Sequence, residues 1–156
     1  MGPQFQTNLG NTMTEDIAKL YSPVIRDHAN QPRNCRRLLS ANFRASSKNP
    51  LCGDCITVFL RVEDGIVREV SFESFGCALC RASASLLSEA AQGLTWQGVC
   101  ELGRAVEAMA TQGRTSSLCQ GELLALGGVH PFPARIPCVL LPWQTVLEAF
   151  DPKPSC

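Results

Sequence analysis

Residues 56–75, ITVFLRVEDGIVREVSFESF, form the stretch of sequence that decides the fold. Apolar and polar residues alternate from Ile56 to Val62, which is typical of a strand with one buried face. Asp64-Gly65 is a two-residue hairpin signal, and it leads into a second expected strand from Ile66 to Phe75. We therefore expect an antiparallel hairpin at the centre of the fold.

Weaker signals extend this hairpin on both sides. A weak strand is expected over Arg37–Ala45, and it would complete a three-stranded antiparallel sheet. Apolar residues at helical spacing, with capping residues at the ends, predict the surrounding helices. These cover Thr14–Ala29 (with a restart at Ser22-Pro23), Ala78–Gln92, a segment capped by Thr95 and ended by Gly113, Leu118–Leu126 and Val139–Phe150. The expected fold class is α+β, a small three-stranded antiparallel sheet covered by helices.

Pro142 limits where the last helix can begin. Only the first turn of a helix has N–H groups without intrahelical partners, so we expect the helix to start within about four residues of this proline. Cys138 then lies close to a helix N-terminus, where the helix dipole favours a thiolate.

Composition narrows the class of protein. A chain of 156 residues with 45% apolar residues is large enough for one domain with a real core. We expect this domain over residues 14–150, with tails at 1–13 and 151–156. The counts of 14 basic and 14 acidic residues are equal, so the chain has no net positive charge to attract nucleic acid or an acidic membrane. No apolar run approaches a membrane span, and residues 1–13 lack a signal core, so we expect a cytoplasmic protein.

The cysteine content indicates metal or sulfur chemistry. There are nine cysteines, and this odd count excludes a complete disulfide framework. Without an export signal, cysteines are expected to bind metal, to react or to fill the core.

Three short motifs carry most of the chemical information. They are NPLCGD at residues 49–54, FGC at residues 75–77 and PARIPC at residues 133–138. Thiolates bind zinc or iron, and a carboxylate can complete a tetrahedral site. Three thiolates with one carboxylate would leave one weaker ligand that can dissociate.

The order of these motifs resembles that of a known family. NPLCGD at 49–54, GCALCRAS at 76–83 and FPARIPC at 132–138 are similar to the motifs of the U-type iron–sulfur assembly proteins, the group of SufU, IscU and the NifU N-terminal domain. The resemblance extends from about Leu20 to Phe150 and implies the same α+β fold. It also implies that zinc or a labile iron–sulfur cluster is held by Cys52, Asp54, Cys77 and Cys138.

One feature favours the SufU type within this family. About sixty residues separate Cys77 from Cys138, a long insertion that resembles SufU, which accepts sulfur from a pyridoxal-phosphate cysteine desulfurase and holds zinc. The implied partners are a cysteine desulfurase and cluster-receiving apoproteins. Cys138 is the first candidate for the sulfur-accepting thiol, and the protein would be at most a zinc-dependent sulfurtransferase. Family members commonly carry His or Lys where this chain has Pro137, which leaves Asp54 as the fourth ligand.

Two other functions remain open. In the first, the protein is an IscU-like scaffold that builds a cluster on the same residues and hands it on. In the second, which belongs to another class, Cys52, Cys55, Cys77 and Cys80 form two Cys-x-x-Cys pairs, 21 residues apart, that hold a structural zinc for partner binding. Against the second stands the expected helix at the second pair, where a zinc ribbon would have a β-knuckle.

The histidines and the remaining cysteines receive simpler interpretations. His28 is expected on a helix surface in contact with solvent, and His130 in a loop, more often solvated than bound to metal. Cys35, Cys100 and Cys119 are expected to be small apolar residues in the core or in loops.

Overall fold

The structure, a computed structural model, describes residues 17–50 and 53–150. Both predicted tails, 1–13 and 151–156, lie outside the described residues. The elements that follow one another along the chain are α2 (Pro23–Asn30), β1 (Phe43–Lys48), β2 (Cys55–Glu63), β3 (Ile66–Phe75), α3 (Ala78–Ala90), α4 (Trp96–Gln112), the 3-10 helices η1 (Gly121–Val129) and η2 (Pro133–Arg135), and α5 (Ile136–Phe150). The predicted α+β class is confirmed.

The central hairpin forms as its sequence predicts. The sheet has the antiparallel order β1-β2-β3. Asp64 and Gly65 turn the chain between β2 and β3 with φ angles of 55° and 73°, in the left-handed region that such a hairpin turn requires. Ile56 and Leu60 are buried, as the alternation along β2 predicts.

The first strand lies further along the chain than expected. Its predicted range was Arg37–Ala45, whereas β1 spans Phe43–Lys48. The reason lies at Asn42, whose side-chain oxygen accepts a hydrogen bond from the Val62 N–H at 2.9 Å while its amide donates to the Val62 carbonyl at 2.8 Å. The Asn42 side chain therefore takes both the N–H and the carbonyl of Val62. The residues before Asn42 cannot use these groups to extend the pairing of β1 with β2.

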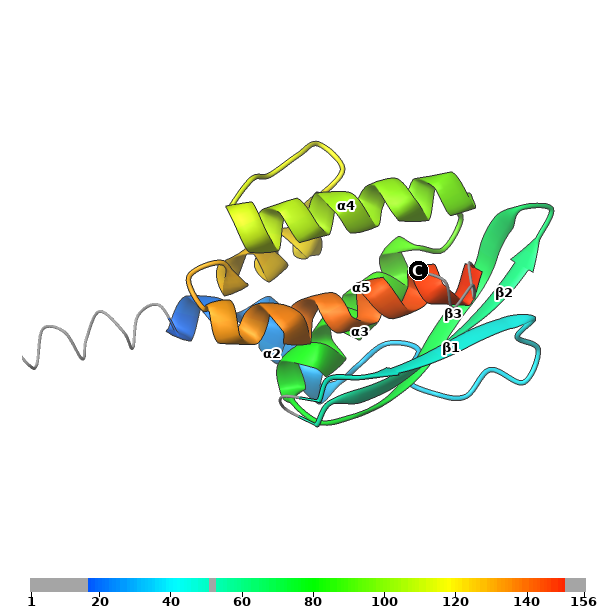
Figure 1. The fold of residues 1–156 in the computed structure, drawn as a ribbon, viewed down its shortest axis with the longest axis horizontal. Coiled ribbons are helices and arrows are strands. Elements are labelled where there is room, and N and C mark those ends of the chain that lie inside the picture. The colour runs from blue at the N-terminus through cyan, green and yellow to red at the C-terminus, as the bar shows by residue number, and fades with distance from the viewer. Residues whose placement is uncertain (1–16, 51–52, 151–156) are drawn as a thin grey trace, which may run out of the picture.

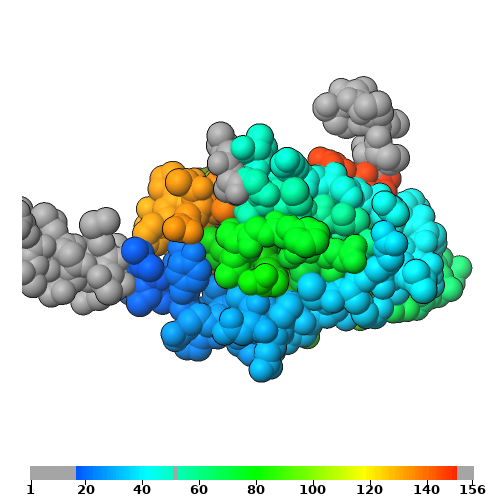
Figure 2. All heavy atoms as spheres, turned by 90° about the horizontal axis from the view of Figure 1, so that it is seen from below, coloured from blue at the N-terminus to red at the C-terminus, as the bar shows by residue number. Residues whose placement is uncertain are grey.

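The helices cover one face of the sheet in two layers (Figure 1). α3 and α5 pack on each other and on the strands, and α4 lies beyond them against α5 and η1. Small side chains let α3 pack closely against its neighbours, because Ala82, Ser83, Ala84 and Ser85 are all buried. Figure 2 shows segments near residues 30, 80 and 135 side by side on one face.

The expected restart near the N-terminus is confirmed. Residues 17–20 are helical, the chain turns at Tyr21, and α2 begins with Pro23 in the first helical turn. The Ser22 hydroxyl accepts a hydrogen bond from the Ile25 N–H at 3.4 Å, as expected of an N-cap. Among residues 17–50 and 53–150, no helix has the length and apolar character needed to span a bilayer.

Two predictions about the C-terminal half are wrong. The helix expected over Leu118–Leu126 is instead the 3-10 helix η1, which begins only at Gly121. Gly121 has a φ of 60°, so a right-handed helix from Leu118 cannot continue through it. α5 begins six residues before Pro142, not within four, and the helix continues through the proline. Pro142 has no N–H to donate to the Cys138 carbonyl. The carbonyl of the following residue, Val139, accepts a 2.6 Å hydrogen bond from the Ser83 hydroxyl.

Candidate metal centre

Three of the four predicted site residues converge at one end of the sheet. Asp54, Cys77 and Cys138 each offer a ligand atom, and these atoms all lie within 4.8 Å of one another. Asp54 directly precedes β2, Cys77 directly precedes α3, and Cys138 is in the first turn of α5. Figure 1 shows α3 beginning at the end of the sheet where β1 leads into β2. Cys52, the fourth predicted residue, lies outside the described residues.

Backbone hydrogen bonds position Asp54. The Asn49 N–H donates to the Asp54 carbonyl at 2.8 Å, and the Gly53 N–H donates to the Asn49 carbonyl at 2.8 Å. Gly53 has a φ of 76°, a left-handed conformation in which glycine has no Cβ penalty. The loop therefore returns on itself and directs Asp54 inward, where the residue is 1% exposed.

Gly76 allows Asp54 to approach the start of α3. The Cys77 N–H donates a 2.8 Å hydrogen bond to Oδ1 of Asp54, and the Cys77 Sγ lies 3.4 Å from Oδ2. Gly76 has a φ of 129°, and a Cβ at this position would overlap Oδ1 and lie 2.9 Å from the Asp54 Cα. Only glycine fits both the conformation and the space.

Cys77 is the N-cap of α3. Its Sγ accepts a hydrogen bond from the Cys80 N–H at 3.4 Å, in the position where a capping side chain receives an unpaired helical N–H. Burial raises the pKa of the Cys77 thiol above its ordinary value, the Cys80 N–H lowers it, and the negative charge of Asp54 raises it further. The raised pKa keeps the metal-free thiol protonated, so binding of a metal ion here would displace a proton.

Cys138 reaches the site from the first turn of α5. It is 5% exposed and is the third residue of α5, so the expectation of a cysteine close to a helix N-terminus is confirmed. Nearby Arg135, in η2, donates a 2.9 Å hydrogen bond to the Tyr21 hydroxyl, with its guanidinium 5.9 Å from the centre of that ring. This contact connects the segment before Cys138 to Tyr21, just before α2.

The donor set suits a soft or borderline metal ion. Two thiols and one carboxylate already provide three ligands, and zinc and iron both accept sulfur and oxygen donors. With Cys52 as a fourth ligand, the site would have the composition expected from the sequence, three cysteines and one aspartate. A site of this kind holds a metal ion less permanently than four thiolates, because the carboxylate is the harder and weaker donor.

The two additional cysteines lie apart from this group. Cys80 is buried in the core on α3, and Cys55 is on β2 with its Sγ 3.6 Å from the Gly53 carbonyl. Within residues 17–50 and 53–150, neither belongs to a group of ligand atoms that converge. The described cysteines also form no disulfide with one another. This geometry gives no support to a structural four-cysteine zinc module.

The prediction for His28 is wrong, because the residue is 0% exposed. Its Nδ1 lies 2.7 Å from the Ser85 hydroxyl and its Nε2 lies 3.1 Å from Oε1 of Glu122. A signal for this burial was present, since His28 follows Val24 and Ile25 at the spacing of the apolar face of α2. His130 has its Nδ1 3.2 Å from the Ala110 carbonyl.

The chain is similar in sequence to known proteins over most of its length. The model of the family described as the NifU-like N-terminal domain matches residues 20–136. The scaffold protein IscU of Thermotoga maritima, described as an iron–sulfur cluster assembly protein, is 35% identical over 133 residues, which cover 83% of this chain and 92% of that protein. The zinc-dependent sulfurtransferase SufU of Bacillus subtilis is also 35% identical over 133 residues, covering 84% of this chain and 89% of SufU.

A solved structure supports the same relationship. The crystal structure of FiSufU from Fervidobacterium islandicum superposes with a TM-score of 0.78 at 28% identity, covering 85% of this chain and 97% of that one. The similarity in fold therefore extends over most of this chain.

Proposed function

The chain belongs to the NifU-like N-terminal domain family, and from this membership we propose that it is an iron–sulfur cluster assembly protein that accepts persulfide sulfur from a cysteine desulfurase. The acceptor site consists of Asp54, Cys77 and Cys138, with Cys52 as the fourth ligand. The observation that supports this proposal best is the convergence of a carboxylate and two thiols, within 4.8 Å, from three separate segments of the chain.

Cys138 is the nucleophile in this proposal. Its thiolate attacks the outer sulfur of the desulfurase persulfide, a new S–S bond forms on Cys138, and the desulfurase thiolate leaves with the electron pair of the broken S–S bond. The N-terminal position on α5 favours this thiolate because the helix dipole stabilises negative charge there. With a metal ion bound, Asp54 would be the weakest of the four ligands, since a carboxylate binds a soft ion less firmly than a thiolate does.

The chain's own residues fit a zinc ion at this site. Cys52, Asp54, Cys77 and Cys138 would hold it, and bound zinc would maintain the thiols as thiolates at neutral pH. Cys77 would gain from this effect, because its pKa is raised by burial in the metal-free protein. Its hydrogen bond from the Cys80 N–H remains available to a thiolate.

Stimulation of a cysteine desulfurase tests the proposal. The zinc-loaded protein is mixed with the desulfurase and cysteine, and alanine formation is measured as the protein concentration rises. Cys138→Ser retains the size of the side chain and loses the nucleophile, so stimulation should be absent even at saturation. Cys100→Ser, which changes a cysteine on α4, is the matched control and should stimulate normally. Full stimulation by Cys138→Ser would move the acceptor role to another cysteine.

A second candidate function uses the same residues. The similarity to the IscU scaffold of Thermotoga maritima is as high as that to SufU, at 35% identity. In this alternative the four ligands hold a labile iron–sulfur cluster that is later transferred to apoproteins. Anaerobic reconstitution with ferrous iron and sulfide, followed by transfer to an apo-ferredoxin, would distinguish the scaffold from a protein that transfers sulfur alone.

A further inference from the structure

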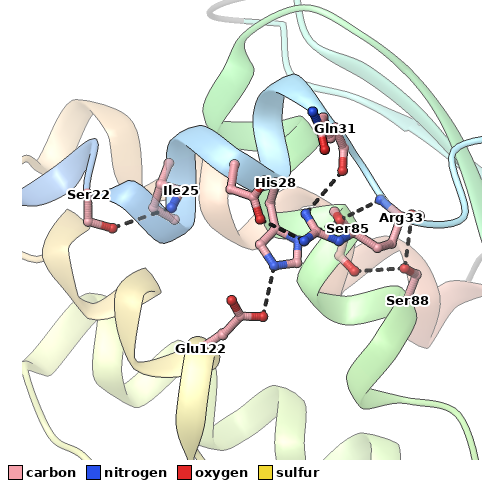
Figure 3. A network of polar contacts seen from close by, with 9 residues as sticks. Ser22, Ile25, His28, Gln31, Arg33, Ser85, Ser88 and Glu122 are labelled. Carbon is pink, nitrogen blue, oxygen red and sulfur yellow. Dashed lines mark hydrogen bonds and ion pairs between the residues drawn. The ribbon is translucent and has the colours of Figure 1, made fainter.

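A second group of ligand atoms lies outside the thiol site. His28, Glu89 and Glu122 each offer one atom, all within 4.8 Å of one another. They come from α2, α3 and η1, which are far apart in sequence and meet here (Figure 3). The group shares no residue with Asp54, Cys77 and Cys138, and the proposed function does not use it.

The imidazole of His28 is held in one orientation. The ring is fully buried, and its Nδ1 lies 2.7 Å from the hydroxyl of Ser85, which is itself buried. The Arg33 N–H donates to the same hydroxyl at 2.8 Å and fixes its position. Histidines that bind metal commonly have their second ring nitrogen fixed in this way. Nε2 is therefore the ring atom that faces the carboxylates, as Figure 3 shows for Glu122.

The two carboxylates repel each other. Glu89 and Glu122 bring negative charges close together beside the His28 ring, and like charges at this separation are unfavourable. The Arg33 guanidinium donates to Asp27 at 2.6 Å and to the Gln31 carbonyl at 3.1 Å. Its positive charge also interacts with Glu89 and Glu122 and offsets part of their repulsion. A divalent ion between the carboxylates and Nε2 would relieve this repulsion.

We propose that His28, Glu89 and Glu122 bind a divalent first-row transition-metal ion such as Zn²⁺ or Fe²⁺. The imidazole nitrogen favours such an ion over Mg²⁺ or Ca²⁺, which prefer oxygen ligands alone. Nε2 binds in its unprotonated form, and Nδ1 donates its proton to the Ser85 hydroxyl, which has two lone pairs for this bond and for the Arg33 N–H. Because no thiolate takes part, the site binds more weakly than the thiol site.

The bound ion would have a structural consequence. It would connect α2 and α3 to η1, which lies in the long stretch between Cys77 and Cys138. The chain continues from η1 through η2 into α5, so the ion would hold the part of the stretch that leads to Cys138. We therefore expect it to raise the melting temperature of the protein as well.

Cobalt titration of the zinc-loaded protein tests the proposal. Zinc binds more tightly than cobalt and remains in the thiol site, so added Co²⁺ reports on the second site. We expect a further equivalent of Co²⁺ with d–d absorption and no sulfur-to-cobalt charge-transfer band. Glu89→Gln and Glu122→Gln should each weaken this equivalent by at least about tenfold and abolish the increase in melting temperature. The matched control, Glu107→Gln on the exposed side of α4, should bind as wild type does.

The glutamine variants separate a metal ligand from a structural role. Glutamine at position 122 still accepts a hydrogen bond from Nε2, and either variant removes one of the two repelling charges, so the metal-free melting temperature should not fall. The proposal is overturned if no further equivalent binds, if both variants bind Co²⁺ as wild type does, or if the added cobalt shows a thiolate charge-transfer band.

Discussion

At the scale of single residues, Gly76 controls how closely Asp54 approaches Cys77. Gly76→Ala would place a methyl group on Oδ1 of Asp54 in a conformation that alanine rarely adopts. We expect a loss of about 1–3 kcal/mol in the free energy of unfolding, together with loss of bound zinc. Gly65→Ala is the matched control, because its φ is also positive and no atom lies within 4 Å of the added Cβ. Zinc content should remain normal in the control, and equal zinc content in the two variants would contradict the account.

Asp54 is the residue that makes the site labile in our proposal. Asp54→Cys would give a site with four thiolates, which suit zinc better than oxygen does. A competing chelator should then remove zinc more slowly, while sulfur acceptance falls because no ligand dissociates easily. Simple misfolding would instead lower both quantities. If the variant held zinc tightly and still accepted sulfur at the parent rate, dissociation of the carboxylate would not be the controlling step.

The residues of the site were largely predictable, and their surroundings were not. Cys77 and Cys138 stand in motifs whose order points to one family. The burial of His28 was missed because histidine is polar and a lone helical histidine is most simply placed in solvent. Its partners, Ser85 and Glu122, are distant in sequence, so no local pattern relates them to His28.

At the scale of elements, Ser83 connects the two helices that carry the thiols. Its hydroxyl donates to the Val139 carbonyl at 2.6 Å and accepts from the Trp143 Nε1–H at 3.0 Å, all in the buried core. Ser83→Ala leaves both groups without this partner, and we expect a loss of about 1–3 kcal/mol in the free energy of unfolding. Urea denaturation would measure this loss. Ser117→Ala, at an exposed position, should change stability little, and an equally small effect of Ser83→Ala would contradict the bridging role.

The elements were predictable where the determining signal is local. The Asp64-Gly65 turn and the Ser22-Pro23 restart depend on adjacent residues, and both formed as expected. The start of β1 depends on the bond between Asn42 and Val62, and the start of α5 depends on packing that tolerates Pro142. These are tertiary effects, and propensity alone does not contain them.

At the scale of the whole molecule, the fold brings three separate segments to one site. From spacing alone, the Cys-x-x-Cys pairs left a four-cysteine module open, because the sequence does not say which thiols converge. The structure separates Cys55 and Cys80 from Asp54, Cys77 and Cys138. The roles of the three converging residues as ligands stay a prediction, as does the role of Cys52.

Zinc content distinguishes the two ligand sets. After aerobic expression, Cys138→Ser should lose most of its zinc, because one of the converging thiolates is removed. Cys55→Ser should keep its zinc, since Cys55 lies on β2 outside the group. The four-cysteine module predicts the reverse for both variants, and elemental analysis of the purified proteins decides between them.

The location of the transferred sulfur tests the central claim most directly. After reaction of the zinc-loaded protein with a cysteine desulfurase and cysteine, thiols are blocked and the protein is digested, and mass spectrometry identifies the peptide that has gained one sulfur atom. We predict that the added sulfur is on Cys138, in the first turn of α5. An added sulfur found on Cys35, Cys55 or Cys100, with Cys138 unmodified, would contradict the account.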